Sequence, residues 1–248
     1  MTRVKALLWE AIFRFPYLAR NLFMSRAFCK LAFKSNFALN SLDKKLKAFL
    51  PAEPNFFIEI GGNDGISQSN TKRLELFESW TGVLVEPFPG NFERMALTRA
   101  RSTRLFNAAC VPFDYTSPQV ELTYSDLMTV SDSLPTDISD SKEHALSGES
   151  WLKNDIAVHQ FLAPARTLQS ILEEAAAPKR IGFFSLDVEG VELAVLRGVD
   201  HSSFRFDWLL VESRSPDQIE TFLVDVGYEF VEKLTEHDYL FRDSKAPS

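Results

Sequence analysis

The sequence has few of the residues that cross-link small proteins through disulfides or bind metal ions. Cys29 and Cys110 are its only cysteines, and it contains four histidines in 248 residues. Two widely separated thiols provide neither a disulfide framework nor a set of metal ligands, because both need several cysteines at close spacing. We therefore expect reduced, partly buried thiols in a cytoplasmic protein.

Long apolar runs are also missing. No run reaches the roughly 18 residues that a membrane-spanning helix needs. Glu10 interrupts the only candidate for the apolar core of a signal peptide, and no small-residue cleavage site follows it. Neither a membrane span nor a secretion signal is expected.

Basic residues are scarce outside the N-terminal fifth of the chain. Residues 1–50 contain ten Lys or Arg and two Asp or Glu, a net charge of +8, which leaves −15 for residues 51–248. A nucleic-acid substrate normally requires a basic surface. The acidic body therefore argues against nucleic acid as a partner.

Residues 1–50 are predicted to form a basic helical extension, in which Pro16 suits the first turn of a helix. The apolar residues on one helical stripe are Leu18, Leu22, Cys29 and Phe33. Two interpretations remain open. The stripe docks on the rest of the chain as a cap, or it lies on an anionic membrane surface at the inner face of the membrane.

A short helix is expected over residues 41–50, capped by Ser41 or Asp43. Pro51 and Pro54 follow with only Ala52 and Glu53 between them. This is the most favourable domain boundary, which separates the extension from residues 51–248.

The stretch 56–65 organises the remainder of the chain. An apolar run that carries Glu59 ends in a glycine-rich turn, which predicts a buried strand followed by a ligand-binding loop. Gly61 and Gly65 lack Cβ, so the backbone can bend sharply there and a ligand can approach it closely. A helix over 71–79 follows. Strand, turn and helix form the first half of a nucleotide-binding α/β unit.

A second apolar strand, over 81–87, ends in Glu86. Its carboxylate is placed to accept hydrogen bonds from both hydroxyls of a ribose. The turn lacks the Gly-x-Gly-x-x-Gly spacing of a dinucleotide site, and Asp64 would repel a phosphate. A nucleoside with an amino-acid end suits the turn better. Glu59 and Asp64 are then expected to face the positively charged part of S-adenosylmethionine (SAM).

Strands and helices alternate along the rest of the chain. Further strands are predicted over 105–111, 120–124, 157–163, 181–186, 206–211, 228–232 and 239–241, and helices over 92–101, 167–172 and 219–226, the second of them capped by Thr167. This order predicts an α/β fold with a seven-stranded sheet and a closing antiparallel hairpin. Asn107 and Ala108 are expected near the adenine. Residues 125–149, with His144 and Trp151 in or beside them, are predicted to form a substrate lid.

The sequence resembles the FkbM-type methyltransferases over roughly residues 55–243. The motifs that carry the resemblance are Glu59-x-Gly61-x-Asn63-x-Gly65, Ser69-Asn70-Thr71, Gly82 to Pro87 and Asp187 to Glu192. The resemblance implies a class I, Rossmann-like SAM-methyltransferase fold and O-methylation of a sugar or another hydroxyl on a polyketide, glycolipid or glycan. The residues expected to bind the cofactor are Glu59, Gly61, Asn63, Asp64, Gly65, Asn70, Glu86, Pro87, Asn107, Ala108 and Asp187.

Methyl transfer to a hydroxyl requires alignment of the acceptor and removal of its proton. Asp187, at the end of the strand over 181–186, is the leading candidate for the base or for orienting the acceptor. Glu189, Glu192 and Glu212 are the alternatives. Two other routes remain open. One is a histidine base, for which the candidates are His159, His201 and His237. The other is a divalent cation such as Mg²⁺, held by Asp187 with Glu189 or Glu212.

Two further function classes compete with a methyltransferase. The basic extension also suits a peripheral membrane-binding protein whose methyltransferase fold is catalytically inactive. A nicotinamide-dependent oxidoreductase is the third class, and the glycine spacing and Asp64 disfavour it.

Overall fold

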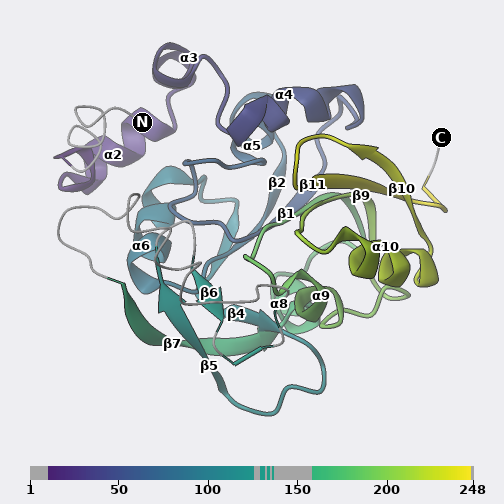
Figure 1. Cartoon of the computed structure of the whole chain (residues 1–248). Coiled ribbons are helices and arrows are strands. Elements are labelled where there is room, and N and C mark those ends of the chain that lie inside the picture. Colours follow the sequence, from purple (N-terminus) through teal and green to yellow (C-terminus); the bar gives the residue numbers. More distant parts are fainter. Residues whose placement is uncertain (1–10, 126–128, 132, 135, 137–157, 247–248) are drawn as a thin grey trace.

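The computed structural model describes residues 11–125, 129–131, 133–134, 136 and 158–246. Its centre is a seven-stranded sheet in the order β10-β11-β9-β8-β1-β2-β3 (Figure 1). The strands are β1 (Phe56–Ile60), β2 (Thr81–Val85), β3 (Arg104–Phe106), β8 (Arg180–Leu186), β9 (Arg205–Glu212), β10 (Tyr228–Lys233) and β11 (Asp238–Asp243). β11 runs antiparallel to both of its neighbours, and β1, β2, β3, β8 and β9 are parallel. The predicted fold is therefore confirmed, including its closing hairpin.

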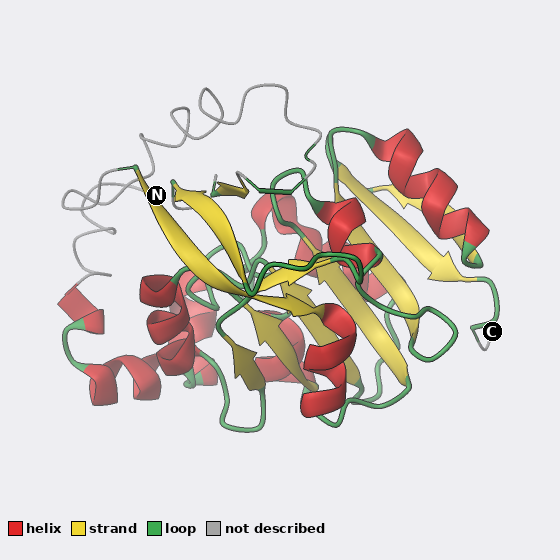
Figure 2. Cartoon of the chain, turned by 90° about the horizontal axis from the view of Figure 1, so that it is seen from below, coloured by secondary structure: helices red, strands yellow, loops and turns green. Residues whose placement is uncertain are grey.

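Neighbouring residues of the central strands pack into two different cores, because side chains alternate across a strand. Ile58 and Phe184 pack beneath α8 (Leu168–Glu174), α9 (Glu192–Leu196) and α10 (Pro216–Asp225). Phe57 and Phe183 face the other side, which α4 (Leu42–Lys45), α5 (Lys72–Glu78) and α6 (Pro89–Thr98) cover. Figure 2 shows helices on both faces of the sheet. All four side chains are fully buried, so both faces of these strands are covered and apolar residues occur side by side in them rather than alternating with polar ones.

Four predicted helices form close to the expected positions, and α5 fits the prediction over 71–79. Thr167 caps α8 as predicted, because its Oγ1 accepts a hydrogen bond from the backbone N–H of Ser170 at 3.2 Å. α6 and α10 both begin three residues earlier than expected, at Pro89 and Pro216. The fixed φ of proline suits the first turn, where its missing N–H would have no helical partner.

A second sheet of four strands stands beside the first, in the order β4-β7-β5-β6. Its strands are β4 (Ala109–Val111), β5 (Gln119–Tyr124), β6 (Val130–Ser131) and β7 (His159–Thr167). The prediction of one continuous strand over 105–111 is wrong. The chain leaves the large sheet after Phe106, and β4 pairs with β7 instead. Asn107 marks the break, since its side-chain amide donates to the backbone carbonyls of Glu86 and Pro87 at 2.8 and 2.9 Å.

Most of the predicted lid, with His144 and Trp151, lies outside the described residues. The predicted strand over 120–124 is confirmed as β5, in which exposed and buried residues alternate. Its buried side chains, Val120, Leu122 and Tyr124, turn toward the rest of the protein. The second sheet therefore packs against the rest of the protein through these side chains and is not an isolated hairpin.

The N-terminal segment forms two helices, α2 (Pro16–Phe23) and α3 (Arg26–Phe33), with Pro16 in the first turn as predicted. The chain breaks between them at Ser25, whose Oγ accepts a hydrogen bond from the N–H of Phe28. The predicted stripe is partly wrong, because the buried residues of α2 lie one position beyond the predicted ones. The fully buried residues are Ala19, Phe23 and Cys29, and they pack with Phe37, Ile66 and Leu76.

Residues 39–48 form short helical turns around α4 rather than one helix. Neither predicted cap operates: Ser41 makes no capping hydrogen bond, and Asp43 accepts from the backbone N–H of Phe37 at 2.8 Å. Leu42 and Leu46 join the core of Phe57 and Phe183. None of the helices in the described part of the chain is both long and apolar enough to cross a bilayer.

Candidate active site

The carboxyl ends of β1, β2 and β8 meet at one point, because Ile60 pairs with both Val85 and Leu186. A cleft that is open to solvent lies at this edge. Glu59, Glu86 and Asp187 all line it, although 128 residues separate the first from the last. Asn63, Asn70, Pro87 and Ala108 from the predicted cofactor set line it as well.

Gly61 allows β1 and β8 to approach each other closely at the floor of the cleft. Its φ is +87°, and a Cβ built on it would lie 1.9 Å from the carbonyl oxygen of Asp187. The N–H of Asp187 donates to the carbonyl of Ile60 at 3.2 Å, and the N–H of Gly61 donates to Val85 at 3.1 Å. Only glycine fits here, because both the backbone conformation and the available space exclude a side chain.

Glu59 forms a buried ion pair with Arg99 at 2.7 Å. The same carboxylate accepts hydrogen bonds from the hydroxyls of Ser69 and Thr71 and from the backbone N–H of Asn70. We expected Glu59 to face the cationic part of a ligand. Instead, its charge is balanced from within the protein, and its bonds hold residues 69–71 against the cleft.

Asn70 is presented to the cleft by this network. Its Nδ2 donates to the Oγ of Ser185 at 3.0 Å. Its Oδ1 is buried and accepts no hydrogen bond from any described residue. A buried acceptor without a donor is costly, so Oδ1 is a point at which a bound donor would be stabilised.

Asp64, Gly65 and Asn107 do not line the cleft, contrary to the sequence-based expectation. Asp64 is buried, and its carboxylate accepts from the backbone N–H groups of Ile66 and Ser67 and from the Ser67 hydroxyl. Short acidic side chains commonly bond the backbone just after them in this way. A Cβ on Gly65 would lie 2.4 Å from the Oγ1 of Thr98. These residues shape the loop that carries the cleft.

Glu86 closes the other side of the cleft. Its Oε2 accepts from the N–H of Asn63 at 2.9 Å, and its Oε1 accepts from the N–H of Phe88 at 2.9 Å. Each carboxylate oxygen can accept two hydrogen bonds. The side chain is therefore oriented by the backbone while it still faces the cleft.

Several cleft residues were not predicted from the sequence. Apolar ones come from β5, α9 and the segments beside them, and polar ones come from the glycine loop and β6. They include Val120, Leu122, Leu134, Val191, Val195, Ser67, Gln68 and Ser131. The alternation in residues 119–124 could have identified Val120 and Leu122, because it marks one face of that strand as buried.

Asp187 belongs to a crowded group of carboxyls. Its carboxyl group is hydrogen-bonded to that of Glu212, which follows Val211 on the neighbouring strand β9. Burial and the negative charges of Glu212 and Glu189 raise the pKa of Asp187 well above its ordinary value. Burial, with the charges of Asp238 and Glu189, raises the pKa of Glu212 to about 7. Two adjacent carboxyls do not both ionise easily, so this pair takes up a proton at a higher pH than isolated carboxyls do.

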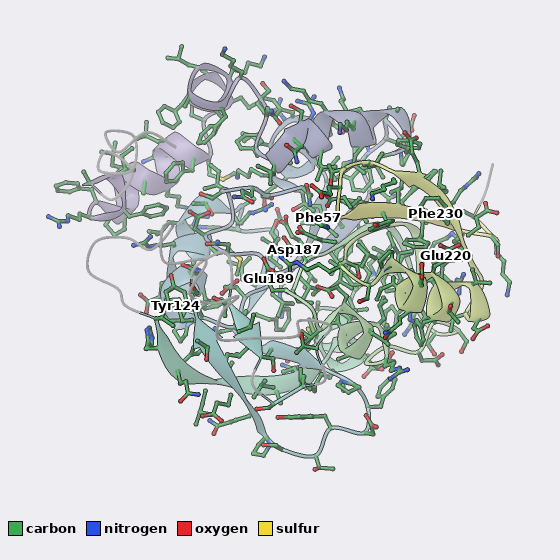
Figure 3. The ribbon with its side chains drawn as sticks, in the orientation of Figure 1. Phe57, Tyr124, Asp187, Glu189, Glu220 and Phe230 are labelled. Carbon is green, nitrogen blue, oxygen red and sulfur yellow. The ribbon has the colours of Figure 1, made fainter. Side chains whose placement is uncertain are left out.

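The other acidic candidates hold the loop after Asp187. Glu189 lines the cleft beside Asp187 (Figure 3) and forms an ion pair with Arg214 at 3.1 Å. It adopts a positive φ of 51°. Glu192 is buried, and its Oε1 accepts from the N–H groups of Val188 and Gly190. These hydrogen bonds to the backbone order the loop.

The comparison with known families decides the assignment of the chain. A family model described as "Methyltransferase FkbM domain" matches residues 59–239. This protein belongs to the FkbM methyltransferase family. It is therefore a SAM-dependent methyltransferase, as the resemblance implied.

Solved structures show only distant similarity to this FkbM methyltransferase. A precorrin-6y C5,15-methyltransferase from Geobacter metallireducens is 13% identical, with a TM-score of 0.37 over 81% of this chain and 86% of that chain. A METTL16 methyltransferase domain is 11% identical, with a TM-score of 0.41 over 95% and 82%. The N-terminal domain of human METTL16 with SAH is 10% identical, with a TM-score of 0.36 over 92% and 82%. No curated protein matches significantly.

The cleft of the FkbM methyltransferase fits SAM. Gly61 lines the cleft with bare backbone, and Asn70 lines it with a side chain whose buried Oδ1 has no donor among the described residues. Glu86 faces the same space with an oriented carboxylate. A cationic amino group, a ribose and an adenine require an acceptor, a carboxylate and a small apolar wall of this kind.

The alternative routes to catalysis receive no support. His201 is buried away from the cleft, and burial lowers its pKa to about 4. His159 lies in an aromatic cluster with Phe88 and Tyr124, and neither it nor His237 is among the described residues that line the cleft. The described residues contain no group of three or more His, Cys, Asp or Glu side chains arranged to hold a metal ion. Nothing in the described structure therefore supports the predicted Mg²⁺.

The ion pair between Glu59 and Arg99 gives a prediction about stability. Arg99→Ala leaves a buried carboxylate without its cation, which typically costs about 3–5 kcal/mol. We expect a large drop in the urea midpoint of unfolding followed by circular dichroism. Arg101→Ala, which removes an exposed arginine two residues away, is the matched control and should unfold like the wild type. Equal midpoints for the two variants would contradict this account of the pair.

Proposed function

We propose that this FkbM methyltransferase is an O-methyltransferase that modifies a hydroxyl of a sugar, in a glycan or a glycolipid. The observation that carries the proposal is the hydrogen-bonded pair of Asp187 and Glu212 at the cleft. A hydroxyl keeps its proton at neutral pH and must lose it during transfer, so it requires a base. A carboxyl pair that titrates near pH 7 is a stronger base than an isolated carboxylate.

Five residues of the protein are proposed to hold SAM. Glu86 accepts hydrogen bonds from the ribose hydroxyls, and the Oδ1 of Asn70 accepts one from the amino group. Ala108 and Pro87 contact the adenine, and the backbone at Gly61 lies against the methionyl portion. SAM supplies a methyl group on a positively charged sulfur, which needs no further activation by the protein.

Asp187 is the proposed base because it lines the cleft, whereas Glu212 is not among the described residues that line it. The proton moves from the acceptor hydroxyl to a carboxylate oxygen of Asp187, and Glu212 stabilises the protonated form by its hydrogen bond and its charge. Glu189 and Arg214 hold the loop in place through their ion pair. Glu212 is thus a positioning residue for Asp187.

The sugar class is supported by the composition of the cleft wall. Ser67, Gln68 and Ser131 offer hydroxyl and amide groups, and Val120 and Leu122 offer an apolar surface. A sugar ring presents hydroxyls at its rim and C–H groups on its faces, so it requires both. The family resemblance points to the same class of acceptor.

The proposed roles separate cofactor binding from catalysis. Asp187→Asn keeps the shape of the side chain but removes the base, so we expect turnover to fall at least 100-fold while SAM affinity stays within about threefold. Glu86→Gln should weaken SAM binding, because its carboxylate is the proposed ribose acceptor. Isothermal titration calorimetry and single-turnover kinetics measure the two effects. Exchanged effects would show that the roles are wrongly assigned.

The carboxyl pair predicts the pH dependence of the reaction. The wild-type rate should rise with pH through about 7, as the pair loses its proton. Glu212→Gln removes a negative charge that raises the pKa of Asp187, so the rising limb should move to lower pH. The pH profile of the rate under single turnover tests this. A profile that stays in place in Glu212→Gln would exclude Glu212 as a positioning residue.

The chemical nature of the product tests the O-methylation itself. Extracts of glycolipids and glycans from cells that lack the protein are incubated with it and with SAM that carries a labelled methyl group. We expect label in material that survives alkaline hydrolysis and releases methylated sugars in acid, because methyl ethers resist base and methyl esters do not. Asp187→Asn is the control. Label confined to amines or to base-labile esters would refute the proposal.

A further inference from the structure

The N-terminal helices expose an unusual share of the apolar surface. Ten large apolar side chains are exposed in the described part of the chain, and five of them lie between residues 15 and 39. These five are Phe15, Tyr17, Leu18, Leu31 and Leu39. Single exposed apolar residues are normal on soluble proteins, so the concentration in one short segment is the informative feature.

The body of the protein does not cover these exposed side chains, because α2 and α3 pack against it with their opposite faces. Ala19, Phe23 and Cys29 are fully buried against the body, whereas Tyr17 is 85% exposed and Leu31 is 84% exposed. Figure 1 shows both helices at one edge of the molecule, outside α5 and α6. In Figure 3 many of their side chains extend away from the body.

Two arginines lock the helices in this orientation. The Nη1 of Arg20 donates to the carbonyl of Ala96 in α6 at 3.0 Å, and the Nε of Arg26 donates to the carbonyl of Leu76 in α5 at 2.6 Å. The apolar side chains are therefore presented outward by a docked structure. The two interpretations of the extension, a cap and a surface-binding segment, apply to opposite faces of the same helices.

Positive charge accompanies the exposed apolar residues. Residues 11–50 contain eight Lys or Arg and a single acidic residue, Asp43, which is buried. Arg14, Lys30 and Lys34 are exposed, close in sequence to the exposed apolar residues. Residues 51–248 carry a net charge of −15, so an anionic surface would attract this segment and repel the rest of the protein.

We propose that the outer faces of α2 and α3 dock on an anionic lipid bilayer, with Tyr17, Leu18 and Leu31 among the headgroups and Arg14 and Lys34 against the lipid charge. Apolar and aromatic side chains flanked by Lys and Arg are the composition that binds at a bilayer surface. The opposite charges of segment and body orient the protein on that surface. This proposal is independent of the nature of the methyl acceptor.

Vesicle flotation with the full-length protein tests the proposal. The vesicles contain phosphatidylcholine alone or phosphatidylcholine with phosphatidylserine, at low and at high salt. We expect the ratio of bound to free protein to be at least about tenfold higher on the anionic vesicles and to fall with salt, because each cation near such a surface strengthens binding several-fold. Wild-type protein that stays unbound on both vesicles overturns the proposal.

Surface variants locate the contact. Tyr17→Ser with Leu31→Ser removes apolar contact, and Arg14→Glu with Lys34→Glu reverses two charges. Each pair should lower the bound-to-free ratio at least about tenfold. Val224→Ser is the matched control, since Val224 is 54% exposed on α10 and belongs to the acidic part of the chain. Variants that float like the wild type would overturn the proposal.

Two further measurements distinguish lipid binding from misfolding and from self-association. SAM titration of each variant shows that its cleft is intact and that any loss of flotation is not a loss of folding. Light scattering during size-exclusion chromatography reports the oligomeric state. If Tyr17→Ser with Leu31→Ser converts a dimer to a monomer, the face is an interface between two copies, and the proposal is wrong.

Discussion

A buried charge at the end of β1 is the constraint on which the rest of the site depends. Glu59 lies inside the protein beside fully buried Arg99, and its other bonds reach Ser69, Asn70 and Thr71. An uncompensated carboxylate in this position would be very costly. The pair therefore ties the segment after the glycine loop to the end of α6. The shape of the cleft depends on this ion pair, because Asn70 lines the cleft only while residues 69–71 are held in place.

The second electrostatic feature, the pair of Asp187 and Glu212, lowers the stability of the fold at neutral pH instead of raising it. Asp187 and Glu212 are brought together by adjacent strand ends, and burial with neighbouring carboxylates outweighs the opposing charge of Arg214 on Glu212. Their pKa values are higher in the folded protein than in an unfolded chain. The folded state therefore binds more protons, and stability is lost as the pH rises from the ordinary carboxyl range toward about 7. A protein that keeps this arrangement gives up stability at neutral pH, as expected where a base must be poised for chemistry.

The two N-terminal helices, α2 and α3, pack against the protein core on one face and are exposed to solvent on the other. Ala19, Phe23 and Cys29 complete the core beside α5 and α6, while Tyr17 and Leu31 face outward. A helix can do this because residues about two apart point to opposite sides. The sequence pattern suggested a single stripe through Leu18 and Leu22. In α2 the buried residues are Ala19 and Phe23, each one position beyond the predicted one, and the break at Ser25 starts α3 as a separate helix.

Several features followed from the sequence alone, since they depend on local pattern. The apolar runs before Gly61, Glu86 and Asp187 specified buried parallel strands, and parallel strands bring their ends to one edge of a sheet. Only the tertiary structure decided which side chains face the cleft. Asp64 bonds its own loop, Arg99 neutralises Glu59 from 40 residues away, and Glu212 meets Asp187 across two strands. Such contacts join residues that are distant in the chain, and their partners are chosen by packing and charge balance, which no local pattern encodes.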